Sequence, residues 1–372
     1  MSKKRFLITA LVLLVLSTLV YLQVRTWKKF DWHRFWAATH HTHKFYLVAG
    51  VALVYLDYFL RAVRWKILLR PVCPEARSAD LVAPTMIGFT GLALLGRPGE
   101  FIRPYLISRK VNLNMSSQVA VWTVERIFDT GAFALIMAVN ILWSRNELRE
   151  LPGFAHAPIR YFLGHPFTSF TIFELFAVGL LVGVALVALL AFRVRMNPSG
   201  AAKVFVRIFG LISPKFGRAV GKRVLAFGEG LNTVKDLGSF FQLSGLSLLI
   251  WIIIGFAYMA VTHAYAIHRL SVMTLSSVFL LTAASVVGGV LQLPVVGGGS
   301  QLATIGMLRG VFNLSPELAT SCGIMLWLVT FMSVTPAGLA LAHFEHVSLT
   351  KVEEESIEEE QKAEREEDQS IG

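Results

Sequence analysis

The chain has 372 residues, of which 16% are charged and 55% are hydrophobic, and its mean hydropathy is +0.60. This balance excludes a soluble globular protein, whose surface needs far more charge, and is typical of an integral membrane protein. The net charge of +11 does not indicate a nucleic-acid partner. The basic residues cluster in short loops beside apolar segments, where they act as topology signals.

Six apolar segments are long enough to be transmembrane helices, since about 20 residues cross ~30 Å of hydrocarbon. They are Phe6–Leu22, Phe45–Leu60, Val119–Trp143, Phe173–Phe192, Phe240–Tyr265 and Leu318–Ala342. Three basic residues precede the first segment and no small-residue cleavage site follows it, so we expect an uncleaved span. Basic residues place the N-terminus, the end of the second span and the loop at 193–238 on the cytoplasmic side.

Two shorter apolar stretches, 81–95 and 275–293, are followed by glycine-rich sequence. If the first stretch crossed the membrane, the basic sequence after it would face outside. The extra crossing would also place the basic loop at 193–238 on the outer side, against the rule that basic loops are cytoplasmic. We therefore expect two re-entrant hairpins, at about 80–110 and 272–312. Irregular backbone at membrane depth is tolerated only inside protein or beside a wet cavity, so each hairpin is a candidate site.

The two hairpins share a weak repeat. A shift of 201 positions aligns Gly88 with Gly289, Gly96 with Gly297, Glu100 with Gln301, and Asn112 with Asn313. Each half then reads as span, hairpin, span, with the halves in opposite orientation, as in many secondary transporters. Two ordinary glycine-rich helices are the alternative interpretation.

These features predict an all-α fold, a polytopic membrane helix bundle with about six full spans and two re-entrant helical hairpins in an inverted repeat. The membrane domain covers residues 1–345. The acidic tail at 346–372 holds no apolar stripe and is expected to be cytoplasmic, as a solvated helix or disordered.

Charged residues inside apolar helices are the candidate site residues, because an ionisable group at bilayer depth costs about 2.5–3.5 kcal/mol. Asp57, Arg61 and Arg64 follow at helical spacing on one face of the second span. Glu125 and Asp129 lie one turn apart, with Arg126 able to pair with Asp129. Each group predicts either a polar site or a network that only holds helices together.

The first hairpin combines flexible backbone with charge at Arg97, Gly99, Glu100 and Arg103. Guanidinium groups bind phosphate through paired hydrogen bonds, and glycines let backbone N–H groups approach the same oxygens. A lipid phosphate is the anion that this setting suggests, and an interfacial basic loop is the alternative. In the second hairpin, Gly298 and Gln301 offer backbone mobility and an uncharged hydrogen-bonding group, and a helix break without substrate contact is the alternative.

No catalytic motif, nucleotide-binding loop or metal-ligand pattern is present in the sequence, so no catalytic residue, cofactor or metal is expected. The cluster His40, His41 and His43 precedes the second span without nearby cysteines or carboxylates. We interpret it as an interfacial loop.

Four motifs resemble the flippase-like transmembrane family related to the N-terminal part of lysylphosphatidylglycerol synthases, the multiple peptide resistance factors. They are RAVRW at Arg61–Trp65, GRPGEFIRP at Gly96–Pro104, ERIFD at Glu125–Asp129, and the proline-glycine hairpin at Pro294–Gly299. The resemblance covers about residues 5–345. It implies movement of a phospholipid, glycolipid or hopanoid-type lipid between leaflets, with Arg97, Glu100, Arg103, Glu125, Arg126 and Asp129 lining a polar cavity.

The chain departs from the family pattern at Gln301, where a carboxylate commonly follows the glycines, so proton or ion coupling through that position is in doubt. It also shows no soluble aminoacyl-transfer domain after the last span, so lipid aminoacylation is not expected.

We therefore expect a lipid translocator of the cytoplasmic membrane, not an enzyme, with both termini in the cytoplasm. The expected partners are membrane lipids with an anionic or phosphate-bearing headgroup; a homo-oligomer and a lipid synthase partner stay open. Two alternatives remain, namely an intramembrane lipid-modifying enzyme that uses Glu125 and Asp129 as acid and base, and a non-transporting partner of a lipid synthase.

Overall fold

The computed structural model describes residues 30–155, 160–162, 165–167, 169–211, 213–214, 217–218, 220–221, 224, 237–290, 298–348, 352 and 355. This part of the chain is helical except for one short antiparallel pair of strands, β1 (Arg160–Phe162) and β2 (His165–Phe167). The predicted helical class is confirmed for the membrane part, and the strand pair lies in the connection before α9.

Six helices of the described part are long and apolar enough to cross a membrane. They are α3 (Lys44–Leu69), α4 (Ser78–Leu95), α6 (Met115–Trp143), α9 (Ser169–Met196), α12 (Leu237–His263) and the continuous segment of α16 (Pro316–Trp327), η2 (Leu328–Met332) and α17 (Val334–Phe344). Five of the six predicted spans coincide with these helices, and the predicted span 6–22 lies outside the described residues. The sixth helix is α4, which was predicted as one arm of a hairpin.

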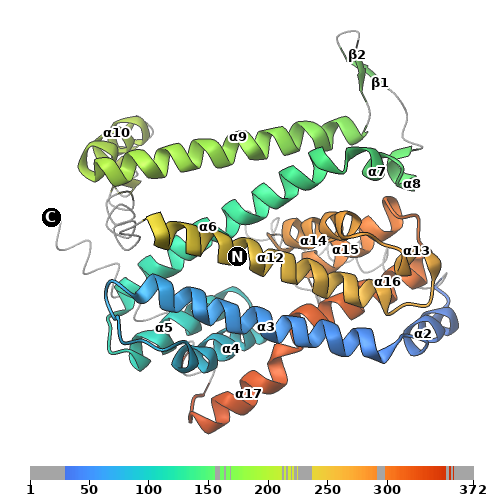
Figure 1. Cartoon of the computed structure of the whole chain (residues 1–372), viewed down its shortest axis with the longest axis horizontal. Coiled ribbons are helices and arrows are strands. Elements are labelled where there is room, and N and C mark those ends of the chain that lie inside the picture. Colours follow the sequence, from blue (N-terminus) through green and yellow to red (C-terminus); the bar gives the residue numbers. More distant parts are fainter. Residues whose placement is uncertain are drawn as a thin grey trace, which may run out of the picture.

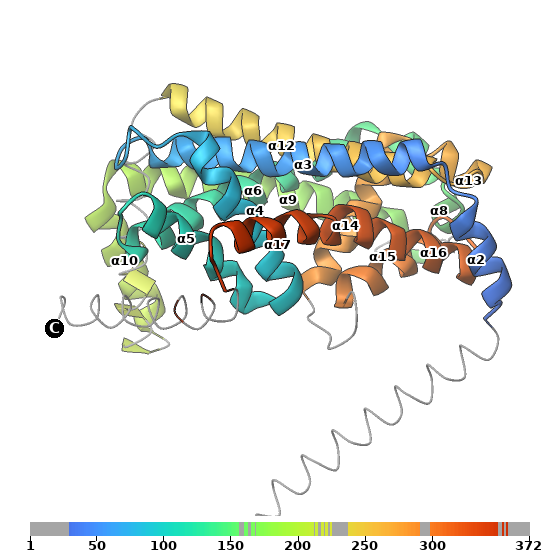
Figure 2. The ribbon, with the colours of Figure 1, turned by 90° about the horizontal axis from the view of Figure 1, so that it is seen from below.

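Helices α3 and α12 pack side by side and antiparallel, and form the most extensive helix–helix contact of the described structure (Figures 1 and 2). Helix α3 continues past its predicted end at Leu60 to Leu69, so Arg61 and Arg64 lie within the helix. A basic side chain in that position cannot simply reach the aqueous interface. It has to find partners inside the bundle.

Two helical hairpins lie beside this pair, at opposite ends of it (Figure 2). The first consists of α4, the 3-10 turn η1 (Arg97–Phe101) and α5 (Ile102–Lys110), and lies where α3 ends. The second consists of α14 (Leu275–Val290) and α15 (Gly298–Gly310), and lies where α3 begins. Its tip, residues 291–297, falls outside the described residues.

Glycines allow the two arms of each hairpin to touch. A Cβ atom at Gly88 would lie 2.4 Å from Cβ of Arg103, and one at Gly99 would lie 2.3 Å from the carbonyl carbon of Gly91. In the second hairpin, a Cβ atom at Gly288 would lie 2.4 Å from the carbonyl oxygen of Gly299. Gly96, with φ of 76°, ends α4 and starts the turn in the predicted tip.

The helices that follow the two hairpins begin and end 201 positions apart. Helix α6 covers 115–143 and the last helical segment covers 316–344. Asn112 and Asn313, which precede them, both adopt left-handed backbone with φ of 52° and 51°. These positions are the same ones that the sequence offset aligns.

The last helical segment is bent at a π-helical turn, η2, just before Pro336. Proline lacks a backbone N–H, and its ring crowds the carbonyl group four residues earlier, so the carbonyl group of Met332 loses its helical partner. Tyr55 of α3 donates to the carbonyl oxygen of Ser333 at 3.0 Å, and Thr90 of α4 donates to that of Val334 at 3.4 Å. Side chains of two other helices therefore stabilise the bend.

The remaining described helices are short or lie at the ends. They are α2 (Trp32–His40), α7 (Arg145–Arg149), α8 (Pro152–Ala155), α10 (Pro198–Gly210) and α13 (His268–Ser271). After α17 the acidic tail returns to α5. Val352 is buried with Ile102 and Tyr105, and the Tyr105 hydroxyl donates to Glu355.

Candidate functional site

The centre of the candidate site is Arg64, whose side chain is 0% exposed. Its guanidinium group donates to Asp129 Oδ1 at 2.7 Å, to Glu125 Oε1 at 2.6 Å and to Ser247 Oγ at 3.0 Å. These partners come from α6 and α12, so Arg64 joins three helices. Such charge-assisted bonds compensate for removing the guanidinium group from water.

The first hairpin joins this network through Arg103 of α5. Its guanidinium group donates to Oε1 of Glu125 at 3.1 Å and to Oε2 at 2.5 Å. The same group lies 4.3 Å from the ring of Trp65 and 5.2 Å from that of Phe89, as in cation–π contacts. Gln118 fixes Trp65 by accepting its indole N–H at 3.2 Å. Glu125 thus accepts from two arginines on two different elements.

Asp57 and Arg61 form the end of the network nearer the middle of α3. Arg61 Nε donates to both oxygens of Asp57, at 2.9 and 3.1 Å, and Arg61 Nη1 lies 3.6 Å from Asp129 Oδ2. Both side chains are buried. The sequence left open whether this pair sits at an exposed helix end, and the structure places it inside the bundle.

Arg126 differs from the other three arginines of the network because it is 41% exposed and only loosely paired. Its Nη2 lies 3.8 Å from Asp129 Oδ2 and 3.9 Å from Glu125 Oε2, and its buried Nε has no hydrogen-bond partner. Its guanidinium carbon lies 6.0 Å from the ring centre of Trp122. This group can bind a further anion without breaking a close ion pair.

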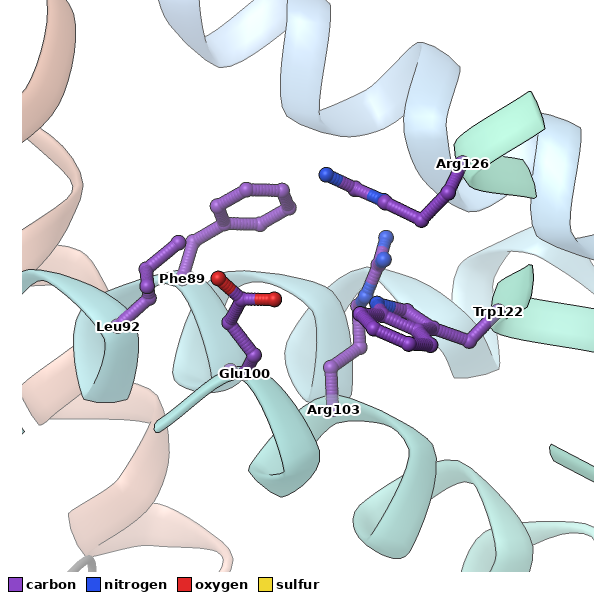
Figure 3. Close-up of a pocket in the computed structure, with 7 residues that line it drawn as sticks. Phe89, Leu92, Glu100, Arg103, Trp122 and Arg126 are labelled. Atoms are coloured by element: carbon purple, nitrogen blue, oxygen red, sulfur yellow. The ribbon is translucent and has the colours of Figure 1, made fainter. Parts of the chain in front are cut away.

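Arg126 lines a small hollow between the first hairpin and α6 (Figure 3). The hollow measures about 20 Å³, and its lining consists of Gly88, Phe89, Leu92, Glu100, Arg103, Trp122 and Arg126. Glu100 and Arg126 lie on opposite sides of it (Figure 3). No described residue forms an ion pair with Glu100. A cation and a carboxylate are thus both presented to the same space.

The structure brings seven of the predicted site residues together, namely Arg61, Arg64, Glu100, Arg103, Glu125, Arg126 and Asp129. Gly99 is buried against Gly91 and shapes the hairpin. Arg97 begins η1, but its side chain lies outside what the structure describes. Gly298 and Gln301 lie in the first turn of α15, in the other hairpin, and have no described contact with this network.

Sequence reasoning missed five residues of the site: Trp65, Phe89, Gln118, Trp122 and Ser247. For two of them a signal existed, because 118, 122, 125 and 129 share one face of a helix at helical spacing. Ser247 carries no such signal, since a serine in an apolar helix normally bonds its own backbone.

Among the described residues of the second half, no ionic counterpart of this network is present. At the 201-residue offset, Thr304 stands for Arg103 and Thr330 stands for Asp129. Hydroxyl groups lie there instead: the hydroxyl oxygens of Ser285 and Ser300 are 2.7 Å apart, and the Thr304 hydroxyl donates to the carbonyl oxygen of Ser300 at 2.8 Å. The charge of the described site is therefore concentrated in the first half.

The chain is similar to the glycosyltransferase AglD of Haloferax volcanii, with 30% identity over 98 residues, which make up 26% of this chain and 16% of that protein. The chain thus spans well under two thirds of that relative. No solved structure matches. Residues 6–338 match the family described as the lysylphosphatidylglycerol synthase TM region, and the chain therefore belongs to this family of multi-pass membrane proteins.

Proposed function

We propose that this protein moves a lipid between the leaflets of the cytoplasmic membrane, and that the anionic part of the headgroup binds at Arg126. The observation that supports this most is the half-exposed Arg126 guanidinium group beside the hollow, within an otherwise closed ion network. A phosphate oxygen would complete the hydrogen bonding of that group, while the acyl chains stay in the bilayer.

Opening of the first hairpin is part of this proposal. A hollow of about 20 Å³ holds roughly one water molecule, so a headgroup enters only when the hairpin moves away from α6. The contact that has to open or turn is the pair of Arg103 and Glu125. Arg103, and Arg97 as the sequence predicts, would then also face the headgroup.

We further propose that the two halves are inverted repeats and that both hairpins are re-entrant. The equal lengths of α6 and the last helical segment, the left-handed Asn112 and Asn313, and the antiparallel pairing of α3 with α12 support this. In such transporters the site lies at the interface of the repeats and rocking exposes it to each side in turn. Both chain ends would be cytoplasmic.

The test is lipid transfer by the purified protein in liposomes, measured by chemical quenching of a fluorescent phospholipid in the outer leaflet. Arg126→Gln should abolish transfer, whereas Arg126→Lys should retain part of it because the charge remains. Arg77→Gln is the matched control, since Arg77 is also an exposed arginine, paired with Asp80 far from the hollow. Transfer by Arg126→Gln at the rate of the control would refute the proposal.

We do not propose a chemical step. Both oxygens of Glu125 accept hydrogen bonds from arginines, and Asp129 is bonded to Arg64, so neither is free to take a proton from a substrate. Incubation of the protein with labelled lipids followed by mass spectrometry separates the alternatives. New lipid species would favour the enzyme, and co-purification of a synthase without transfer would favour the partner role.

A further inference from the structure

Helix α10 presents an apolar stripe that nothing in the described structure covers. Val204, Ile208 and Leu211 recur at i, i+4 and i+7 and are 55%, 54% and 87% exposed. The opposite side of the helix packs on the protein, where Ala202 is buried and Gly221 contacts Val206. The helix is therefore apolar on two sides, of which only one serves the fold.

The position of α10 places this stripe at the end of the bundle that the basic loops predict to be cytoplasmic. Helix α10 follows the C-terminal end of α9 and turns away from its axis (Figures 1 and 2). Asn197 and Pro198 cause the turn, because the Asn197 side chain accepts the N–H of Gly200 and caps a new helix. This is the end of the molecule where α3 finishes in its basic sequence.

Basic residues flank the stripe. Lys203 and Arg207 are exposed and stand one turn apart, beside the row of Val204 and Ile208. Residues 193–235 contain nine lysines or arginines and a single acidic residue, Glu229. An apolar stripe with a basic border, at the level where the bilayer ends, is the pattern of a helix that lies in the headgroup layer.

We propose that α10 docks onto the anionic inner leaflet, with Val204, Ile208 and Leu211 in the headgroup and upper acyl layer and with Lys203 and Arg207 against anionic headgroups. The occupant is a lipid surface because the apolar stripe has a basic border and because α10 directly follows α9, an apolar candidate span whose Leu186 and Leu189 are 60% and 61% exposed. This surface is separate from the site at Arg126 and does not depend on transport.

The test uses one environment-sensitive fluorophore on a cysteine at Leu211→Cys, in a protein that also carries Cys73→Ser and Cys322→Ala. The protein is placed in nanodiscs of phosphatidylcholine alone, or of phosphatidylcholine with phosphatidylglycerol, each with and without a lipid that carries a shallow spin-label quencher. We expect blue-shifted, strongly quenched emission in the anionic discs and much less in the neutral ones. High salt should reduce the difference.

Two variants complete the design. The fluorophore at Ser199→Cys, an exposed position in the first turn of the same helix that points away from the apolar stripe, should stay in water in every lipid. Combined Lys203→Glu and Arg207→Glu should abolish the effect of phosphatidylglycerol at position 211. The proposal is overturned if the label at position 211 remains in water in anionic discs. It is also overturned if the label is quenched equally in both kinds of disc and equally after charge reversal.

The acidic tail of the same chain is the competing occupant. If a variant that ends at Lys351 loses the shielding of position 211 in anionic discs, the tail and not the leaflet covers the stripe. The proposal requires shielding that persists, or increases, without the tail.

Discussion

Replacement of Arg64 by glutamine tests whether the buried network is held together by its central cation. Arg64 is fully buried and bonds two carboxylates at 2.6 and 2.7 Å. Removing one partner of a buried ion pair costs about 3–5 kcal/mol, because the charge left behind is poorly compensated. Glu125 keeps Arg103, and Asp129 keeps Arg61 at 3.6 Å, so we expect the lower end, about 3 kcal/mol.

The loss of stability can be measured as thermal unfolding in detergent. Cys322 is completely buried, so a thiol-reactive fluorogenic dye reports unfolding in a Cys73→Ser background. The entropy of unfolding scales with chain length, so for 372 residues a loss of 1 kcal/mol lowers Tm by roughly 1.3 °C, and Arg64→Gln should lower it by about 4 °C.

Arg126→Gln is the matched control, because the same chemical change is made at a loosely paired arginine that is 41% exposed. An exposed pair contributes about 0–1 kcal/mol, so Tm should fall by roughly 1.3 °C at most. Equal Tm values for the two variants would refute the reasoning, since the network would then not depend on the arginine that is bonded most closely.

Two further predictions concern the first hairpin. Gly99→Ala should greatly reduce the yield of monodisperse protein in size-exclusion chromatography, because the new Cβ atom would lie 2.3 Å from the backbone of Gly91. Gly131→Ala is the control: a Cβ atom at this position meets nothing within 4 Å, so the variant should fold and gain up to about 1 kcal/mol of helix propensity. Val352→Asp should release the tail from α5, seen as faster amide hydrogen exchange over residues 102–110, while Val352→Leu should keep slow exchange. Unchanged exchange in Val352→Asp, or a well-folded Gly99→Ala, would contradict these contacts.

The spans of this protein can be predicted from sequence because length and apolarity alone identify a membrane helix. The predicted first tip is also where the structure turns, since Gly96 takes a backbone angle that other residues avoid. The grouping of Glu125 with Asp129 follows from helical spacing. The partners of these carboxylates do not, because Arg64 and Arg103 reach them across helix contacts that no periodicity specifies.

The prediction for the phosphate site illustrates the same limit. The sequence favoured Arg97 and Arg103, because they stand beside glycines. In the structure Arg103 is bound to Glu125, and among the described arginines of the site the loosely held one is Arg126, one residue after Glu125 on α6, while the phosphate site itself stays a prediction. How closely each arginine is paired depends on which carboxylates its neighbours already bind, and the packing of the hairpin on α6 determines this.

The bend at Ser333 links parts of the protein that are distant in sequence. Tyr55 and Thr90 hold adjacent carbonyl groups of one bend from two different helices, and Gly338, one turn further, packs against Thr90. A sliding movement of α4 along α3 must therefore stretch one of these two bonds or rotate the C-terminal part of the last helix. Motion at the arginine-lined hollow is in this way mechanically connected to the C-terminal end of the last helix.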